Sequence, residues 1–264
     1  MNGFQKIVCA GAMCGLVACG GSPGGGGEGT AAPDPGTPAS HTLTGHWIDP
    51  NNGTVLMVTP DGLGYGVLHT GADATLVRGT LTLTGTTLPL QPLDAVNASG
   101  ESNQRQLTVQ GGLQPSGALA FDVSDPKGVG GPVTLVVDTA YEPPLPLAQW
   151  AGSYVGAAQV AGLQGECLLE LDANGGLTMS NMPTVGDVAC GATGRLDDVA
   201  GAPSLKSFKL CFAGTGCNLS DNPSFEGLAR LAGAAPSPTG PRPLLTLVGT
   251  DLDAQNGLLI EARP

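Results

Sequence analysis

The apolar residues of this 264-residue chain come in short runs, and this spacing limits the fold more than any other feature of the sequence. The runs alternate with polar residues or are continuous for a few positions, and Gly, Pro, Asn or Asp bound them, as in β-strands joined by tight turns. No stretch keeps an apolar stripe at helical spacing over about a dozen residues. With 43 glycines and 22 prolines in the chain, the sequence predicts an all-β fold.

Strand signals recur along the first half of the chain. Residues 54–59 and 63–68 flank Pro60-Asp61-Gly62, which is typical of a hairpin turn. Further strands are expected at 78–84, 106–110, 119–123 and 133–138.

A proline-rich segment then divides the chain. Pro143, Pro144 and Pro146 cannot donate ladder hydrogen bonds, so they predict an extended linker at 143–147. We expect two diverged copies of one unit on either side of it, a first β-domain at 43–142 and a second at 148–264. Each is predicted to be a small antiparallel β-barrel, lipocalin-like or sandwich in form.

Three local matches support the two copies. They are Gly45-His46-Trp47 with Gly152-Ser153-Tyr154, the turn at Asp61-Gly62 with Asn174-Gly175-Gly176, and Phe121-Asp122 with Phe225-Glu226.

The amino-terminal segment has the layout of an export signal. Lys6 is the only early charge, and the apolar run that follows it ends at Cys19. The run is too short for a membrane-spanning helix, which needs about 20 residues, so residues 1–18 are predicted to be a cleaved signal peptide. Residues 19–42 are rich in Gly and Pro without apolar periodicity, and we expect a flexible linker there.

The residues around the predicted cleavage point carry a family signature. Leu16-Val17-Ala18-Cys19, followed by Gly20, resembles the lipobox of Gram-negative lipoproteins. The resemblance implies that the Cys19 thiol receives a diacylglycerol and that the new amino group is acylated with palmitate. Gly20 in place of Asp implies the outer membrane, with the protein facing the periplasm or the cell surface. An ordinary secretory signal is the alternative, and it would also export the protein.

The second half carries another resemblance. Trp150 to Tyr154, Asn174-Gly175-Gly176, Cys190-Gly191, Cys217 and residues 225–228 follow one another in an order similar to that of uncharacterised proteobacterial outer-membrane lipoproteins. The similarity covers residues 148–262. It implies a small antiparallel barrel with a Cys190–Cys217 disulfide, and it implies no activity.

The cysteines after Cys19 are Cys167, Cys190, Cys211 and Cys217. An even set in an exported domain indicates disulfides, and no pair has the spacing of a zinc site. With Cys190 paired to Cys217 as the resemblance implies, Cys167 is expected to pair with Cys211. A Cys211–Cys217 bridge stays open as the alternative.

Composition and motifs argue against several functions. The formal charge of −12 gives no electrostatic footprint for nucleic acid. No Gly-x-Ser-x-Gly motif occurs, and the histidines lie in the half without the predicted disulfides. We therefore expect no enzyme, no catalytic residue and no cofactor.

Metal and acid–base sites are also weak. His46 with Asp49, or His69 with Asp73, supplies two metal ligands where a site needs three or four. The segment 251–257 resembles a calcium loop with its glycine out of place. Glu166, Glu170 and Asp172 share one strand face, which is more typical of a solvated surface.

These observations predict a lipid-anchored cell-envelope protein that acts as a non-enzymatic binding or structural module, with an envelope protein as its partner. The alternative is a carrier that holds a small hydrophobic ligand inside a lipocalin-like barrel.

Overall fold

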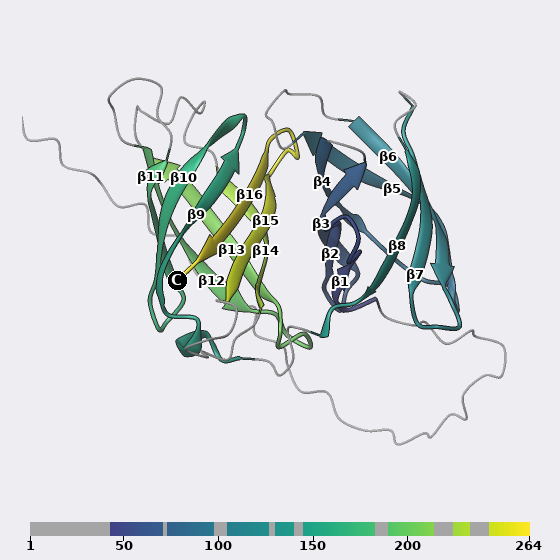
Figure 1. The fold of residues 1–264 in the computed structure, drawn as a ribbon, viewed down its shortest axis with the longest axis horizontal. Coiled ribbons are helices and arrows are strands. Elements are labelled where there is room, and N and C mark those ends of the chain that lie inside the picture. Colours follow the sequence, from purple (N-terminus) through teal and green to yellow (C-terminus); the bar gives the residue numbers. More distant parts are fainter. Residues whose placement is uncertain are drawn as a thin grey trace, which may run out of the picture. The chain divides into compact units, whose positions relative to one another are not determined.

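Two ladders of antiparallel strands make up the computed structural model, and each ladder closes on itself (Figure 1). The structure describes residues 43–70, 73–97, 105–126, 130–139, 145–182, 190–213, 224–232 and 243–264. The predicted all-β fold with two antiparallel barrels is confirmed, and both barrels are closed rather than sandwiches. Within the described ranges, no helix is long and apolar enough to span a bilayer.

The first barrel runs through eight strands in chain order. They are β1 (Gly45–Ile48), β2 (Val55–Val58), β3 (Leu63–Thr70), β4 (Asp73–Thr80), β5 (Thr87–Asn97), β6 (Arg105–Leu113), β7 (Leu119–Ser124) and β8 (Gly131–Val137).

The second barrel repeats this up-and-down order and closes between β9 and β16. A short 3-10 helix, η2 (Leu147–Gln149), precedes it. Its strands are β9 (Gly152–Val160), β10 (Leu163–Leu171), β11 (Gly176–Met182), β12 (Cys190–Asp198), β13 (Lys206–Ala213), β14 (Ser224–Ala232), β15 (Leu244–Asp251) and β16 (Gly257–Arg263).

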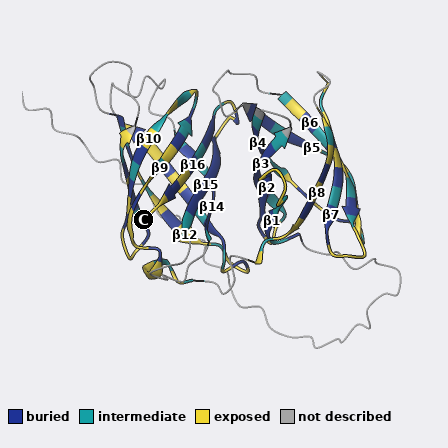
Figure 2. Ribbon diagram, in the orientation of Figure 1, coloured by how far each residue is buried: buried dark blue, intermediate teal, exposed yellow. Residues whose placement is uncertain are grey.

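Each barrel is filled by the inward half of an alternating pattern (Figure 2). In β10, Cys167, Leu169 and Leu171 are buried, whereas Glu166 and Glu170 are exposed. Successive side chains of a strand point to opposite faces, so the period-two pattern of the sequence separates interior from exterior.

A tryptophan lies in each interior. Trp47 is buried in the first core, and its indole N–H donates to the Leu43 carbonyl oxygen at 2.7 Å. Trp150 is buried in the second core, where the Lys206 Nζ lies 5.5 Å from the centroid of its ring. Both indoles act as core side chains.

Several strands are buried on both faces. In β2, Leu56 and Val58 fill the first barrel, while Val55 and Met57 point outward and are also buried. These outward side chains belong to a third apolar cluster, the shared cluster, to which both barrels contribute. Its buried members are Val55, Met57, Tyr65, Val67, Leu76, Ala202, Leu205, Leu228 and Val248.

The shared cluster joins the barrels into one compact unit, Pro38–Pro264. Leu76 of β4 shows how closely they pack, since a β carbon on Gly257 of β16 would lie 2.2 Å from the Leu76 Cδ1. The sequence predicted two domains but not this shared core.

Two strands of the first barrel, β1 and β5, were missed from the sequence. β5 contains Pro89 and Pro92, which argue against a strand. The register between β5 and β6 shifts between Leu88 and Gln91, and this irregularity accommodates Pro89. The omission of β5 also misaligned the match of Phe121 with Phe225. Phe121 lies on the seventh strand of its barrel, whereas Phe225 lies on the sixth strand of the other.

We expect replacement of Leu76 by Ala to destabilise both barrels together, by about 2–5 kcal/mol, because Leu76 is fully buried in the shared cluster. Leu90→Ala is the matched control, since Leu90 is 64% exposed and its truncation should change the stability by less than about 0.5 kcal/mol. Denaturant unfolding of single-tryptophan variants, which retain either Trp47 or Trp150, follows one barrel at a time. A midpoint that moves only for the Trp47 signal would contradict this coupling.

Candidate functional site

A cleft lies beside the shared cluster in the described part of the chain. It encloses about 550 Å³, and both barrels line it. The first barrel contributes the turn between β2 and β3 together with β3, and the second contributes the end of β12, the loop after it, β13 and β14. The lining residues are Thr59, Pro60, Asp61, Leu63, Tyr65, Asp197, Val199, Ala200, Ser207, Phe208, Lys209, Glu226, Gly227 and Leu228.

Apolar side chains supply one part of this inter-barrel cleft. Tyr65, Phe208 and Leu228 are buried, and Leu63 is partly buried. The Phe208 ring belongs to the second core and covers Gly227 of β14 from inside the barrel, where a β carbon on Gly227 would lie 2.8 Å from the Phe208 Cε1. Glycine at 227 is therefore required for the ring to occupy its position.

Charged side chains surround the apolar part. Lys209 Nζ donates to the Glu226 carboxylate at 2.9 Å, and these two residues are cross-strand neighbours on β13 and β14. Asp61, in the turn of the first barrel, accepts a hydrogen bond from the Thr59 hydroxyl. Both members of the Lys209–Glu226 pair are more than a third exposed, so the pair contributes little to stability.

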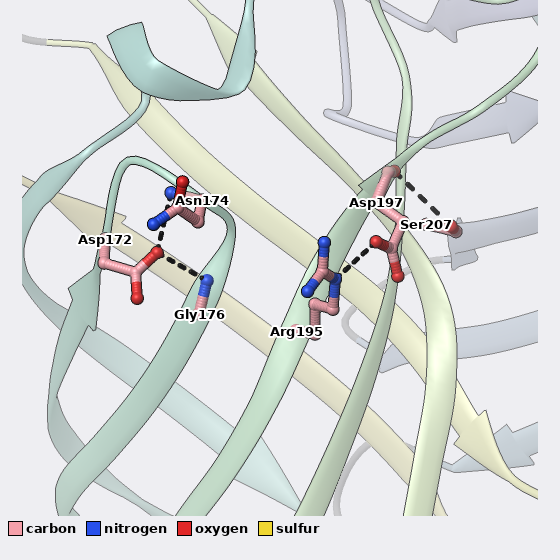
Figure 3. A network of polar contacts seen from close by, with 6 residues as sticks. All are labelled: Asp172, Asn174, Gly176, Arg195, Asp197 and Ser207. Carbon is pink, nitrogen blue, oxygen red and sulfur yellow. Dashed lines mark hydrogen bonds and ion pairs between the residues drawn. The ribbon is translucent and has the colours of Figure 1, made fainter.

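Asp197 completes the charged rim. Arg195 donates to the Asp197 carboxylate at 2.5 Å, and the Ser207 hydroxyl donates to the Asp197 carbonyl oxygen at 3.4 Å (Figure 3). The hydrogen bond that Arg195 donates to Asp197 raises the pKa of the Arg195 guanidinium, with further contributions from the charges of Asp197 and Asp172.

Tyr65 differs from the other polar residues of the cleft. It is 4% exposed, and the Arg78 guanidinium carbon lies 5.8 Å from the centroid of its ring, within the range of a cation–π contact. Within the part of the chain that the structure describes, its hydroxyl makes no hydrogen bond. Burial raises the pKa of Tyr65 above its usual value; Arg78 opposes this shift and Glu226 adds to it.

A second, polar groove of about 490 Å³ lies on the second barrel and includes Glu170 and Asp172. Asp172 is committed to its own turn, because its Oδ1 accepts the N–H groups of Asn174 at 2.7 Å and Gly176 at 2.8 Å (Figure 3). Gly175, at φ +87°, supplies the left-handed conformation of this turn. Glu166 and Glu170 are exposed on one strand face, as the sequence indicated.

The other acidic segment considered from the sequence is also a turn. The Asp251 Oδ1 accepts the backbone N–H of Gln255 at 2.7 Å and of Asn256 at 3.1 Å, and its Oδ2 accepts from the Asn256 side chain at 2.5 Å. The described residues contain no group of three or more side chains arranged to hold a metal ion.

His46, considered above as one of two possible metal ligands, is a buried residue that joins the two barrels. It lies in β1 and is 4% exposed. Its Nε2 lies 3.2 Å from the Ser204 carbonyl oxygen of the second barrel and donates to it. Nearby, Arg230 forms a buried ion pair with Asp138 at 3.4 Å. Burial, together with the Arg230 charge, lowers the pKa of His46 to about 4, while the bond to Ser204 opposes the shift.

The predicted cysteine pairs have different outcomes. Cys19 and Cys217 lie outside the described residues. Cys190 is disulfide-bonded, and its pairing with Cys217 stays a prediction. The predicted Cys167–Cys211 bridge is wrong in this structure, where both thiols are free. Cys167 points into the second barrel from β10 and Cys211 points outward from β13, so the barrel wall separates them.

Sequence reasoning missed the residues of the inter-barrel cleft. Tyr65 stands between Gly64 and Gly66 in β3, and its ring packs outward against the other barrel. An aromatic residue on the outer face of a strand whose outward neighbours are also apolar is a signal that could have indicated a covered surface.

We expect His46 to make the protein less stable as the pH falls from about 6.5 to 4. In this window the unfolded chain protonates the imidazole and the folded chain does not, so folding is disfavoured by up to about 3 kcal/mol. His46→Gln retains a side-chain N–H donor without this titration, and its free energy of unfolding should fall less over the same range. Equal pH dependence of the two proteins in denaturant titrations would contradict the assignment.

Comparisons with known proteins add little to this description. No protein-family model and no curated protein sequence matches the chain. Among solved structures, a double mutant of the vaccine antigen Transferrin Binding Protein B from Haemophilus parasuis is similar over 83% of this chain, with 12% identity and a TM-score of 0.28. The chain spans 44% of that structure.

Proposed function

We propose that this chain is a lipid-anchored protein of the cell envelope that binds a partner in the inter-barrel cleft and catalyses no reaction. The observation that carries this proposal is the cleft itself, which two different barrels line with an apolar surface and a charged rim. Ligand sites in proteins favour such junctions, and their usual volume of about 300–1,000 Å³ includes the size found here. The partner is a segment of an envelope protein or a small molecule.

The chemistry of the lining supports binding rather than catalysis. The residues that line the cleft include neither histidine nor cysteine. A general base with a pKa near neutrality and an activated thiolate are therefore both missing from this lining. Ser207 is the serine of the lining, and its hydroxyl donates a hydrogen bond to the Asp197 carbonyl oxygen. A carbonyl oxygen is too weak a base to remove the proton of the Ser207 hydroxyl.

The carrier function inside a barrel has less support. The inward side chains of the second barrel, among them Leu169, Phe212 and Phe225, pack into one continuous apolar cluster. Phe212 and Phe225 meet edge to face, with their ring centroids 5.5 Å apart. Side chains that contact one another fill the space that a hydrophobic ligand would need.

The anchor is part of the same proposal. Lipid at Cys19 would attach the chain to the outer membrane, and residues 19–42 would serve as the linker to the barrels. The domain division at 143–147 and the Cys190–Cys217 disulfide complete the proposed organisation. A single acyl chain holds a protein only marginally, whereas two or three anchor it stably.

We expect Cys19→Ser to release the protein from membranes, because the serine cannot form the thioether to diacylglycerol. Fractionation of cells followed by a high-salt wash measures this, with Cys14→Ser as the control that should remain in the membrane fraction. Retention of the Cys19→Ser protein after the wash would contradict the anchor and leave the cleft unaffected.

A large side chain placed in the cleft tests whether the cleft binds a partner. Ala200 is exposed and lines the cleft, so Ala200→Trp should fill it without disturbing either core. Ala157 is exposed on β9 away from the cleft, and Ala157→Trp is the matched control. Amide NMR spectra of the full chain with Cys19→Ser would be titrated with phenylbutylamine, phenylbutanol and phenylbutyrate, which differ in charge.

At least one of these probes should shift amides of β3, β13 and β14, and Ala200→Trp should abolish the shifts. The Ala157→Trp protein should respond as the unmodified chain does. Shifts that survive Ala200→Trp, or the absence of shifts at the cleft with all three probes, would overturn the proposed function.

A further inference from the structure

Resting on the proposed function, we infer that the ligand of the inter-barrel cleft is a protonated amine on an apolar body, with the ammonium held between the Glu226 carboxylate and the Tyr65 hydroxyl. The inference stands on the hydrogen-bonding state of Tyr65, on the charges of the lining and on its apolar part.

The Tyr65 side chain is 4% exposed, and its hydroxyl, which opens to water in the cleft, makes no hydrogen bond to a described residue. A ligand that displaces this water has to supply a hydrogen bond to the hydroxyl in its place. Tyr65 lines the cleft, so a ligand can supply the missing partner. The oxygen has lone pairs that accept from a donor such as an ammonium.

The charges of the lining favour a cation. Carboxylates come from both barrels, Asp61 from the first and Asp197 and Glu226 from the second, whereas Lys209 is the cation of the lining. Lys209 is bonded to Glu226, so it is already committed to a carboxylate. Asp197 is paired with Arg195 in the same way, which leaves Asp61 as the lining carboxylate without an ion pair among the described residues. An anion would still meet a net negative rim, and the overall charge of −12 attracts cations to the protein.

Glu226 is the carboxylate best placed to receive the amine. Its charge acts on the Tyr65 hydroxyl, and both side chains line the same cleft. An ionised carboxylate has about four lone-pair sites, so the bond from Lys209 leaves acceptor capacity. The salt bridge is partly exposed, and its side chains can adjust to a second donor.

The apolar part of the cleft specifies the rest of the ligand. Leu63 and Leu228 present carbon surface beside the charged rim. A small inorganic cation would leave this surface exposed to water, and a purely apolar molecule would leave the Tyr65 hydroxyl without a partner. An amine joined to an aliphatic or aromatic body satisfies both, as does a lysine-like side chain of a partner protein.

The three phenylbutyl probes separate these classes, because they share one body. We expect phenylbutylamine to bind at least about tenfold more tightly than phenylbutanol, and phenylbutyrate to bind more weakly than either. Glu226→Gln should weaken the amine about tenfold, and Tyr65→Phe should weaken it several-fold, with little change for the alcohol. Glu170→Gln removes the same charge from the second groove and should leave the amine affinity unchanged.

The outcomes distinguish the two proposals. Equal binding of amine and alcohol in the cleft, or tighter binding of phenylbutyrate, would leave the proposed function standing and overturn the ligand class. Amine binding that Tyr65→Phe and Glu226→Gln leave unchanged would also overturn it. If no probe shifts the amides of the cleft, both proposals fail.

Discussion

The shared apolar cluster determines the arrangement of the strands around it, because it requires strands that are buried on both faces. An isolated small barrel places its apolar residues inside and exposes its outer face to water. In this protein the outer faces of β2, β3 and β4 carry Met57, Tyr65 and Leu76, and the second barrel meets them with Leu228 and Val248. Separation of the barrels would expose all of this surface, so the hydrophobic effect favours the joined form.

The same contact determines where polar groups are tolerated. His46, Arg230 and Asp138 are buried near the cluster, and their hydrogen bonds and ion pair run from one barrel to the other. The ion pair and the His46 hydrogen bond offset part of the cost of burying these groups, because an unpaired charge in this position would destabilise the fold. Tyr65 lies where the cluster gives way to the cleft, and there a ligand can provide the hydrogen bond that the described protein residues do not.

The general architecture could be predicted because a closed barrel leaves a local signature in the sequence. Inward and outward residues alternate in β10 and β13, and the turns between strands carry glycine. β5 is an exception, since Pro89 and Pro92 normally argue against a strand, and here a register shift accommodates Pro89 while Pro92 pairs with Thr108 in the regular ladder. The cleft could not be predicted in this way, because Tyr65 and Glu226 lie far apart in the sequence and meet only through contact between the barrels.

The cysteines show why a count of residues is a weaker guide than their faces in a strand. Cys167 follows the inward alternation of β10 and behaves as a small apolar side chain, whereas Cys211 occupies an outward position on β13. Burial raises the pKa of the Cys167 thiol to about 11, so the reactive thiolate is scarce at neutral pH. A buried cysteine can therefore persist as a thiol even in an oxidising compartment, because oxidation requires both the thiolate and access to it. An even number of cysteines constrains pairing only among those whose side chains reach the same face of the wall, and in a closed barrel the wall separates the two faces.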